Sequence, residues 1–355
     1  KTSVPVTFFM RMKIIHIIDN VGAGGAQVMV KAFLTHYPNA NAFALRQLSH
    51  QPNNDNRIDV YPSKTKFSIQ RVFWLKSIIN TNPTAIFHLH LINTVYHFTL
   101  IKILFVLKNQ IVIHEHGEIH KADFTGSLLR WCYKNFSKST HFIAVSNDVQ
   151  QELISLRIPI KNTSVINNIG FNQFLSRKET LPFVVGFCGR IEPRKNWKFF
   201  AELALKLKDK NDFHFLMAGS GPEEKKLIDF IKDHGLKNLK FLGYQINMQD
   251  FYGTINCMII PSFWEGSSLV QQEALNSNIP VISFSGKGMS TDSKLNFIMN
   301  QNSLEECKEA IYKIQENYNQ LIITTNSDFN LELETYFENI DEVYQKLIPN
   351  LHANV

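Results

Sequence analysis

The sequence predicts an α/β protein built from two doubly wound parallel sheets. In each half of the chain, short runs rich in β-branched residues alternate with helical patterns, as in parallel sheets with helices on both faces. The alternation stops over the polar segment FNQFLSRKETLP (171–182) and then begins again. A chain of 355 residues, 44% of them hydrophobic, is long enough and apolar enough for two such domains.

Five runs in each half are the predicted strands. In the first half they are KIIHIID (13–19), AIFHLH (85–90), QIVIHEH (110–116), HFIAVS (141–146) and SVINN (164–168). In the second half they are FVVGFCG (183–189), FHFLMAG (213–219), LKFLGY (239–244), CMIIPS (257–262) and PVISFSG (280–286). We therefore predict a first domain over 12–172, a linker over 173–182, a second domain over 183–330, and a C-terminal segment 331–355 whose helix returns to the first domain.

Composition narrows the class of protein and its partners. Lys and Arg number 37 against 31 Asp and Glu, and a net charge of +6 favours acidic partners such as nucleotides, phosphates or an anionic membrane surface. The four cysteines contain no C-x-x-C pair, so neither a disulfide framework nor a zinc ribbon is expected: Cys132, Cys188, Cys257 and Cys307. We expect a cytoplasmic protein.

No segment has the pattern of a signal peptide or a membrane span. The N-terminal apolar run is short, and residues 1–11 are interpreted as an extension or tag. The stretch YHFTLIKILFVLK (96–108) is interrupted by His97 and Lys102 and is shorter than the roughly 20 residues of a spanning helix. Two segments, 66–79 and 128–138, mix basic and aromatic residues as interfacial helices do, although helices packed on a sheet show the same mixture. No nucleic-acid-binding motif accompanies them.

Ligands of open parallel sheets bind at the carboxyl ends of the strands, and two facing sheets enclose a cleft. The motifs that follow predicted strands are therefore the candidates for an interdomain site. The first is NVGAGGAQ (20–27), where glycines before a helix allow backbone N–H groups to approach an anion. A dinucleotide fingerprint needs a third glycine where Gln27 stands and an acid about 20 residues on, so a phosphate or sugar contact, or a simple tight turn, fits better than nicotinamide binding.

Two cations follow the first strand of the second half. Arg190 and Lys195 lie in FCGRIEPRKNW, where a planar guanidinium and a compact ammonium can converge on a diphosphate. A solvated basic loop is the alternative interpretation.

Two acids follow another strand of the second half. Glu265 comes directly after CMIIPS, and Glu273 lies about one turn into a helix that begins near Leu269. Ionised carboxylates only accept hydrogen bonds, so the pair suits the hydroxyl groups of a sugar and a ribose. A loop acid and a helix-surface acid without a ligand are the alternative.

Histidines gather in the first half, at His88, His90, His114, His116 and His120. His114 and His116 point to the same face of a strand and in principle share a metal, but no Cys or Asp completes a tetrahedral set. Core histidines and a substrate-orienting role for His116, which precedes Gly117 at a strand end, remain open. No D-x-D pair occurs, so we expect no divalent metal and no cofactor.

Five motifs in order resemble the retaining glycosyltransferases of family 4, which have the GT-B architecture of two facing Rossmann-like domains. The motifs are GAGGAQ (22–27), HEHG (114–117), GRIEPRK (189–195), AGSGPEE (218–224) and PSFWEGSSLVQQEAL (261–275). The last one carries two glutamates with seven residues between them, as in the family. The resemblance covers nearly the whole chain, from residue 13 to the C-terminal helix.

The resemblance implies a role for each motif. Arg190 and Lys195 neutralise the diphosphate of a nucleotide-sugar, Glu273 accepts from its ribose, and Glu265 lies against the donor sugar. Backbone N–H groups of Gly24 and Gly25 meet the distal phosphate, and His116, or His114 in its place, lies near the site of attack. The resemblance also places further residues in the donor site: Gly221, Pro222, Tyr244, Gln245, Gly266, Ser267, Ser268 and Leu269.

The implied activity is retaining transfer of a sugar from a nucleotide donor, a UDP-sugar by family frequency, to a saccharide or lipid-linked acceptor in polysaccharide or glycan synthesis. The first domain binds the acceptor and the second the donor. Two departures are Gln27, where the family often has Glu, and SGKGMSTDS (285–293), where a glycine-rich or Gly-x-x-Glu segment is common. An epimerase of the same architecture, and a peripheral membrane-binding protein without transferase activity, are the alternatives.

Overall fold

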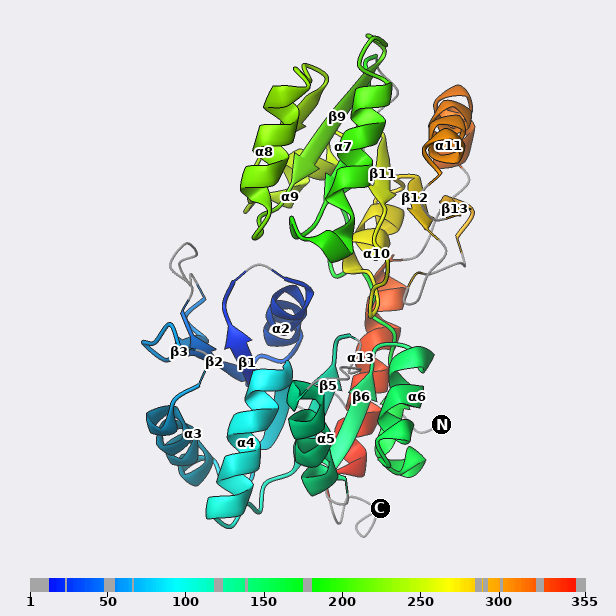
Figure 1. Ribbon diagram of the computed structural model, residues 1–355. Coiled ribbons are helices and arrows are strands. Elements are labelled where there is room, and N and C mark those ends of the chain that lie inside the picture. The colour runs from blue at the N-terminus through cyan, green and yellow to red at the C-terminus, as the bar shows by residue number, and fades with distance from the viewer. Residues whose placement is uncertain are drawn as a thin grey trace. The chain divides into compact units, whose positions relative to one another are not determined.

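The computed structural model describes residues 13–22, 24–47, 55–65, 67–117, 124–137, 140–174, 181–284, 289, 293–300, 303–323 and 329–348. The chain divides into two compact units (Figure 1). The first unit comprises residues 1–167 and 335–355, and the second comprises 168–334. His120 and most of 285–293, which the sequence singles out, lie outside the described residues.

The first unit is a seven-stranded sheet in the order β3-β2-β1-β4-β5-β6-β7, and each of its neighbouring strand pairs is parallel. Its strands are β1 (Ile14–Asn20), β2 (Asn41–Arg46), β3 (Ile58–Val60), β4 (Ile86–His90), β5 (Ile111–Glu115), β6 (Thr140–Ala144) and β7 (Thr163–Val165). Its helices are α2 (Gly25–His36), α3 (Ile69–Thr81), α4 (Ile92–Leu104), α5 (Phe124–Phe136), α6 (Asn147–Ser155), the short η1 (Ile160–Asn162) and α13 (Phe329–Lys346), which begins in the second unit. The strand order reverses between β1 and β4.

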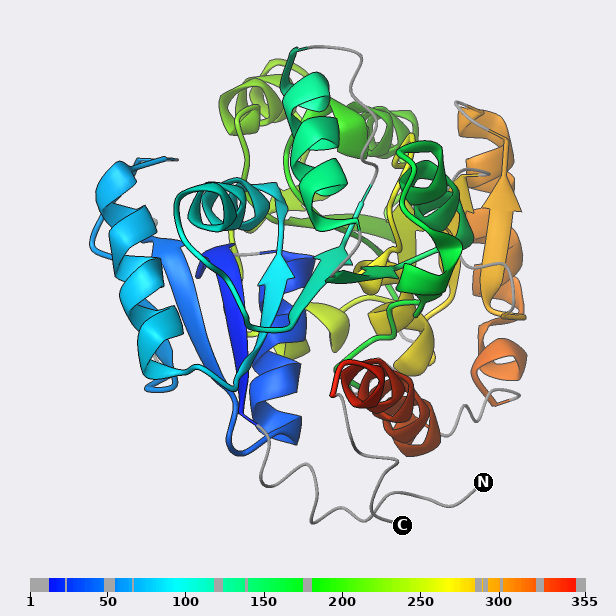
Figure 2. The same cartoon turned by 90° about the horizontal axis from the view of Figure 1, so that it is seen from below.

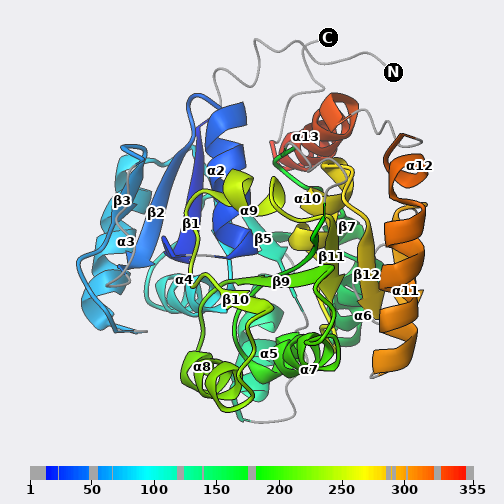
Figure 3. The ribbon, with the colours of Figure 1, turned by 90° about the horizontal axis from the view of Figure 1, so that it is seen from above.

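Helices cover both faces of the first sheet, as the period of its strands requires. Alternate strand residues such as Ile15, Ile17 and Phe87 form one core with α3, α4, α5 and α6. The intervening residues face α2 and α13, whose buried side chains include Phe33 and Tyr344. Figures 2 and 3 show α2 and α13 on the side of the sheet opposite α4 and α5.

The second unit is a six-stranded parallel sheet in the order β10-β9-β8-β11-β12-β13. Its strands are β8 (Phe183–Cys188), β9 (Phe213–Ala218), β10 (Leu239–Phe241), β11 (Cys257–Ile260), β12 (Val281–Phe284) and β13 (Asn296–Met299). Its helices are η2 (Pro193–Lys195), α7 (Trp197–Lys206), α8 (Glu224–Asp233), α9 (Met248–Tyr252), α10 (Leu269–Asn276), α11 (Leu304–Glu316) and α12 (Tyr318–Ile323). The order reverses between β8 and β11.

The predicted fold class of two doubly wound parallel sheets is confirmed. All ten predicted strands form, but β2, β3 and β13 are absent from the prediction. These strands lie at or next to sheet edges, and their burial is incomplete: β3 buries only Ile58, and no residue of β13 is buried. Among the described residues, no helix is long and apolar enough to cross a membrane.

The division between the units falls before the predicted linker, between residues 167 and 168. Residues just after this point pack on α10. Asn276 Nδ2 donates to the Gly170 carbonyl oxygen at 3.1 Å, and Gln173 Nε2 donates to the Asn276 carbonyl oxygen at 3.0 Å. These contacts tie the segment to the second unit although its sequence has no strand or helix period.

Candidate active site

Three loops at the carboxyl edge of the second sheet are joined by backbone hydrogen bonds. The N–H of Gly189, after β8, donates to the Ala218 carbonyl oxygen at 3.1 Å, and the N–H of Gly219, after β9, donates to the Gly243 carbonyl oxygen at 2.8 Å. Gly219 has φ +141°, and a Cβ at this position would lie 1.8 Å from the Gly189 carbonyl oxygen. Only glycine fits this approach, so the motifs GRIEPRK and AGSGPEE form one continuous layer.

Lys195 and Glu265 form an ion pair at this edge. Lys195 ends η2, Glu265 lies in the loop after β11, and Nζ and Oε1 are 2.5 Å apart. The Arg194 guanidinium lies 3.7 Å from the other carboxylate oxygen and 4.6 Å from the centroid of the Trp264 ring. The buried carboxylate therefore faces two cations, of which sequence reasoning identified one.

Arg190 extends into solvent beside this pair. Its side chain is 63% exposed, and Nε lies 3.4 Å from Oε2 of Glu192. Because an ion pair with so exposed a guanidinium is weak, Arg190 can exchange Glu192 for a phosphate. The convergence of Arg190 and Lys195 on one diphosphate stays a prediction.

Glu273 is buried one turn into α10, where Ser268 caps the helix by accepting from the Gln271 N–H at 3.4 Å. Its Oε1 accepts from Asn172 Nδ2 at 3.1 Å and its Oε2 accepts from Tyr252 Oη at 3.0 Å. Burial raises the pKa of the carboxyl group, and the two hydrogen bonds partly oppose the rise. Each oxygen keeps a lone pair for a further donor.

The remaining predicted donor residues occupy the same edge of the second sheet. Gly221 donates its N–H to Glu224 Oε1 at 2.7 Å, and a Cβ there would lie 2.4 Å from the Ile191 carbonyl oxygen. The Ser267 carbonyl oxygen accepts from Asn168 Nδ2 at 3.4 Å, and Gln245 Nε2 donates to the Leu242 carbonyl oxygen at 2.8 Å. Tyr244 and Pro222 are exposed, Gly266 is buried in the loop after β11, and Leu269 begins α10.

The glycine turn of the first unit leaves the start of α2 uncapped by any side chain. Gly24 is the N-cap, and both Gly24 and Gly25 are exposed. Gln27 Nε2 instead donates back to Asn20 Oδ1 at 3.1 Å, and the Gly22 N–H donates to the same oxygen at 2.9 Å. Gln27 therefore holds the turn, and the first N–H groups of α2 stay available to an anion.

A buried ion pair that sequence reasoning missed lies next to this turn. Arg46, at the end of β2, donates to both carboxylate oxygens of Asp19, with its Nη2 2.6 Å from Oδ2, and Asn93 Nδ2 donates to Oδ1 at 2.9 Å. Burial raises the pKa of Asp19, but the bonds from Arg46 and Asn93 outweigh it and the net pKa is lowered. Nothing in the sequence indicated this ion pair, because Arg46 ends β2, a strand that was not predicted.

His116 lies at the carboxyl end of β5, and its Nε2 is 3.0 Å from His90 Nδ1. Burial lowers the pKa of His116 to about 3, so the ring is neutral at pH 7. His114 is fully buried within the sheet face, whereas His116 is only partly buried. Of the two rings, only that of His116 is therefore open to solvent at the strand end.

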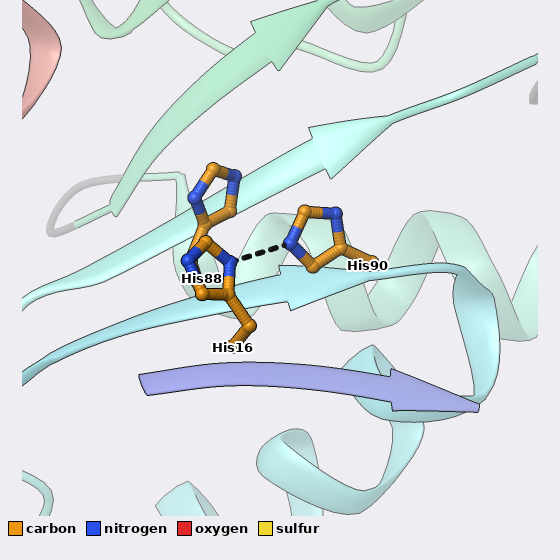
Figure 4. Close-up of side chains that lie close together, drawn as sticks. All are labelled: His16, His88 and His90. Atoms are coloured by element: carbon orange, nitrogen blue, oxygen red, sulfur yellow. Dashed lines mark hydrogen bonds between the residues drawn. The ribbon is translucent and has the colours of Figure 1, made fainter. Parts of the chain in front are cut away.

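Among the described residues, two groups of three histidines have ring nitrogens within 4.8 Å of one another. One group is His16, His88 and His90 (Figure 4), and the other is His90, His114 and His116. Sequence reasoning did not include His16, which lies on β1. Such groups have the ligand type of a zinc or copper site.

Two protein families match the chain in succession. Residues 24–169 match Glycosyltransferase Family 4, and residues 170–326 match Glycosyl transferases group 1. The amylovoran biosynthesis glycosyltransferase AmsD of Erwinia amylovora is 21% identical over 293 residues, covering 78% of this chain and 81% of that protein. A UDP-Gal:alpha-D-GlcNAc-diphosphoundecaprenol alpha-1,3-galactosyltransferase of Escherichia coli is 31% identical over 105 residues, covering 28% of this chain and 27% of that protein.

A solved structure shares the fold over nearly the whole chain. Anabaena HepE in complex with UDP and glucose has a TM-score of 0.76 and 17% identity, covering 95% of this chain and 100% of that one. The fold and the matched families together define a GT-B glycosyltransferase. Within that class, the chain belongs to the glycosyl transferases group 1, with a first unit of the family 4 type. The predicted family, GT-B fold and glycosyltransferase class are confirmed, whereas retention of configuration and independence of metal stay predictions.

Proposed function

We propose that this glycosyltransferase transfers a sugar from UDP to a saccharide or lipid-linked saccharide, with retention of the anomeric configuration and without a divalent metal. The observation that carries the proposal is the cationic edge of the second sheet, where Lys195 and Arg194 meet buried Glu265 and Arg190 is free to exchange its partner. HepE was solved with UDP and with UDP-glucose. The relative from Erwinia is named for amylovoran biosynthesis. The relative from Escherichia is named for galactosyl transfer from UDP-Gal to alpha-D-GlcNAc-diphosphoundecaprenol.

The chemistry follows from the charge that develops on the leaving group. The bond between the anomeric carbon and the UDP oxygen breaks, the acceptor oxygen bonds to that carbon from the same face, and the acceptor proton passes to the departing phosphate. Arg190 and Lys195 stabilise the negative charge that develops on the departing diphosphate, which is the task a metal performs in D-x-D enzymes. Glu273 and Glu265 accept hydrogen bonds from the ribose and the sugar.

The first unit contributes a neutral imidazole and a helix N-terminus. His116, neutral at pH 7, donates a hydrogen bond to the transferred sugar, and the N–H groups of Gly24 and Gly25 meet the distal phosphate. The same unit binds the acceptor.

Calorimetric binding of UDP, GDP, ADP and TDP in EDTA tests the donor half of the proposal. We expect UDP alone to bind tightly and added magnesium to leave its affinity unchanged. Tight binding of a different nucleotide, or binding only with magnesium, contradicts it. NMR of the product formed from the bound nucleotide's sugar then reports the anomeric configuration, and an acceptor-free reaction controls for epimerisation.

We also propose that the first unit contacts an anionic lipid surface through an outer helical face. This face comprises exposed Ile69, Phe73, Ile103, Leu104 and Val106 together with Lys76, Lys102 and Lys108. Phe73 is 57% and Val106 77% exposed, and Lys76 Nζ lies 5.6 Å above the ring of Phe105, which packs against Phe73. Helices α3, α4 and α5 contain no Asp or Glu, so the face matches an anionic membrane in charge as well as in apolarity.

Sedimentation with lipid vesicles tests this contact. We expect the protein to sediment with vesicles that contain anionic phosphatidylglycerol and to remain in solution with neutral ones. The double variant Phe73→Ser/Val106→Ser should lose most of the binding. Ile228→Ser, which removes a 50% exposed apolar residue from α8, is the control. A wild-type protein that stays in solution with anionic vesicles refutes the contact.

A further inference from the structure

Five histidines of the first unit lie on the same face of its sheet. They are His16 on β1, His88 and His90 on β4, His114 on β5 and His116 at its end. The face is covered by α2 and α13, and Phe33 of α2 packs against four of the rings, with centroids between 4.8 and 6.5 Å apart. Five imidazoles in one apolar layer need an explanation, because each brings two polar nitrogens.

The rings form two rows that run across the strands. In the first row, His16 Nδ1 lies 3.0 Å from His90 Nε2 (Figure 4). His90 Nδ1 in turn lies 3.0 Å from His116 Nε2. In the second row, His88 Nε2 lies 3.2 Å from His114 Nδ1, and His88 Nδ1 lies 2.7 Å from Tyr344 Oη. The rows stack on each other, with His88 over His90 at 4.4 Å and His114 over His116 at 4.5 Å between centroids.

This geometry is that of hydrogen-bonded rings and not of a metal centre. Neighbouring rings in a row have centroids 5.3 Å apart and planes inclined by 13° to 30°, so they meet edge to edge. A nitrogen lone pair then points along its neighbour's N–H bond. Ligands of one zinc ion instead point their lone pairs at a common centre about 2.0–2.1 Å away.

Each row has two proton arrangements that satisfy its hydrogen bonds, and the nitrogen without a partner at the end of the row selects one of them. Burial lowers the pKa of all five rings, so each carries one N–H and one lone pair. His16 Nε2 is buried without a partner among the described residues. A lone pair in that position costs less than an orphaned N–H, so the proton of His16 is on Nδ1.

The position of this proton sets the direction of hydrogen-bond donation along the whole first row. His16 Nδ1–H donates to His90 Nε2, and His90 Nδ1–H donates to His116 Nε2. In the second row, His114 Nε2 has no partner among the described residues, so the proton of His114 is on Nδ1 and is donated to His88 Nε2. His88 then carries its proton on Nδ1 and donates it to Tyr344 Oη. The two stacked rows therefore donate in opposite directions, and their ring dipoles oppose each other.

We propose that the His16–His90–His116 row fixes His116 as the tautomer protonated on Nδ1, and that His90 and His16 are positioning residues of this glycosyltransferase. His90 occupies Nε2 of His116 as an acceptor. Nδ1–H of His116 is left as a hydrogen-bond donor for a hydroxyl oxygen of the transferred sugar. The assignment of a sugar as the ligand rests on the proposed function, whereas the tautomer rests on the row alone.

A pair of buried variants separates positioning from packing. His90→Phe and His88→Phe each remove one imidazole from the same strand and the same stack, but only His90→Phe removes a hydrogen bond to His116. Long-range proton–nitrogen NMR of the imidazoles reports the tautomers directly. We expect His116 to be protonated on Nδ1 in the wild type and in His88→Phe, and to populate the Nε2–H tautomer in His90→Phe.

Turnover measured on the same proteins completes the test. We expect kcat to fall at least about tenfold in His90→Phe with KM for the donor changed much less, and to stay within about threefold in His88→Phe. If His90→Phe does not fold, the wild-type spectrum and His16→Phe carry the test. An Nε2-protonated His116 in the wild type, or an unchanged tautomer in His90→Phe, overturns the proposal.

Two further outcomes are distinguishable. Stoichiometric binding of zinc with loss of the imidazole N–H signals would make the cluster a metal centre and refute the rows. An Nδ1-protonated His116 in a protein that transfers no sugar would leave the rows standing and refute the proposed function.

Discussion

Lys195 Nζ lies 2.5 Å from Glu265 Oε1, and both side chains are largely shielded, at 16% and 8% exposed. The ammonium of Lys195 is therefore already engaged by a carboxylate before any donor binds. A phosphate that approaches this edge competes with Glu265 for Lys195, whereas the 63% exposed Arg190 has only its 3.4 Å contact with Glu192 to leave. Under the proposed function, this difference makes Arg190 the cation that a leaving diphosphate recruits at the lower cost.

Arg190→Ala should lower kcat about a hundred- to a thousandfold, because one preorganised donor to the leaving group is lost. The folded state should be unaffected, since the side chain is exposed. Steady-state kinetics with the matching nucleotide-sugar provide the measurement. Lys198→Ala, which removes an exposed cation of α7 outside the site, is the control. A rate for Arg190→Ala within a few-fold of wild type would remove Arg190 from the leaving-group role.

Glu273→Ala should weaken UDP binding and also destabilise the fold. The change removes the proposed ribose acceptor and leaves Tyr252 Oη and Asn172 Nδ2 without their buried partner, at about 1–3 kcal/mol each. Glu273→Gln keeps one carbonyl acceptor and should retain more of both properties. Calorimetric titration with UDP and urea unfolding separate the two effects. Unchanged UDP affinity in a folded Glu273→Ala protein would argue for a purely structural Glu273.

Gly219→Ala should destabilise the second unit by about 2–4 kcal/mol, because the new Cβ collides with the Gly189 carbonyl oxygen in a backbone conformation with φ +141°. Gly235→Ala is the control, since Gly235 also has a positive φ, +60°, but open space around its Cβ. That variant should lose only about 1 kcal/mol. Urea unfolding of both variants measures the difference. Equal losses of unfolding free energy in the two variants would mean that the loops around Gly219 shift to accommodate the added Cβ.

The sequence predicted the parts of this protein whose signal is local. Strand β1 is buried along its whole length, and the loop positions of Lys195 and Glu265 follow from the strands before them. The edge strands β3 and β13 were not predicted, because a strand with few buried residues shows no alternation of apolar and polar residues in its sequence.

Partners that meet only after folding were not predictable. Asn172 and Glu273 are 101 residues apart in sequence, and Asn172 lies in a segment read as the end of a domain. The histidine rows depend on the register of three strands that are distant in the chain, so the sequence showed pairs of histidines and no rows.

Glu115 should make the stability of the protein fall as the pH rises through neutrality. Burial between β5 and α5 raises the pKa of this carboxyl group to about 7, against an opposing hydrogen bond from Tyr133. The unfolded chain releases the proton near its ordinary value, so the contribution of Glu115 to stability is fully present below about pH 4.5 and is lost as the pH rises through 7. The difference corresponds to about 3 kcal/mol.

The buried histidines change the stability with pH in the opposite direction, so their contribution has to be separated from that of Glu115. The pKa of His16 is lowered to about 3, so its contribution is present above pH 6.5 and is lost as the pH falls toward 3. Glu115→Gln preserves a partner for Tyr133 and leaves the histidines unchanged, so the difference between wild-type and variant unfolding free energies isolates Glu115. We expect that difference to shift by about 3 kcal/mol in favour of the variant between pH 4.5 and 8. If the unfolding free energies of the wild type and of Glu115→Gln changed in parallel with pH over this range, Glu115 would ionise near its ordinary pKa in the folded protein.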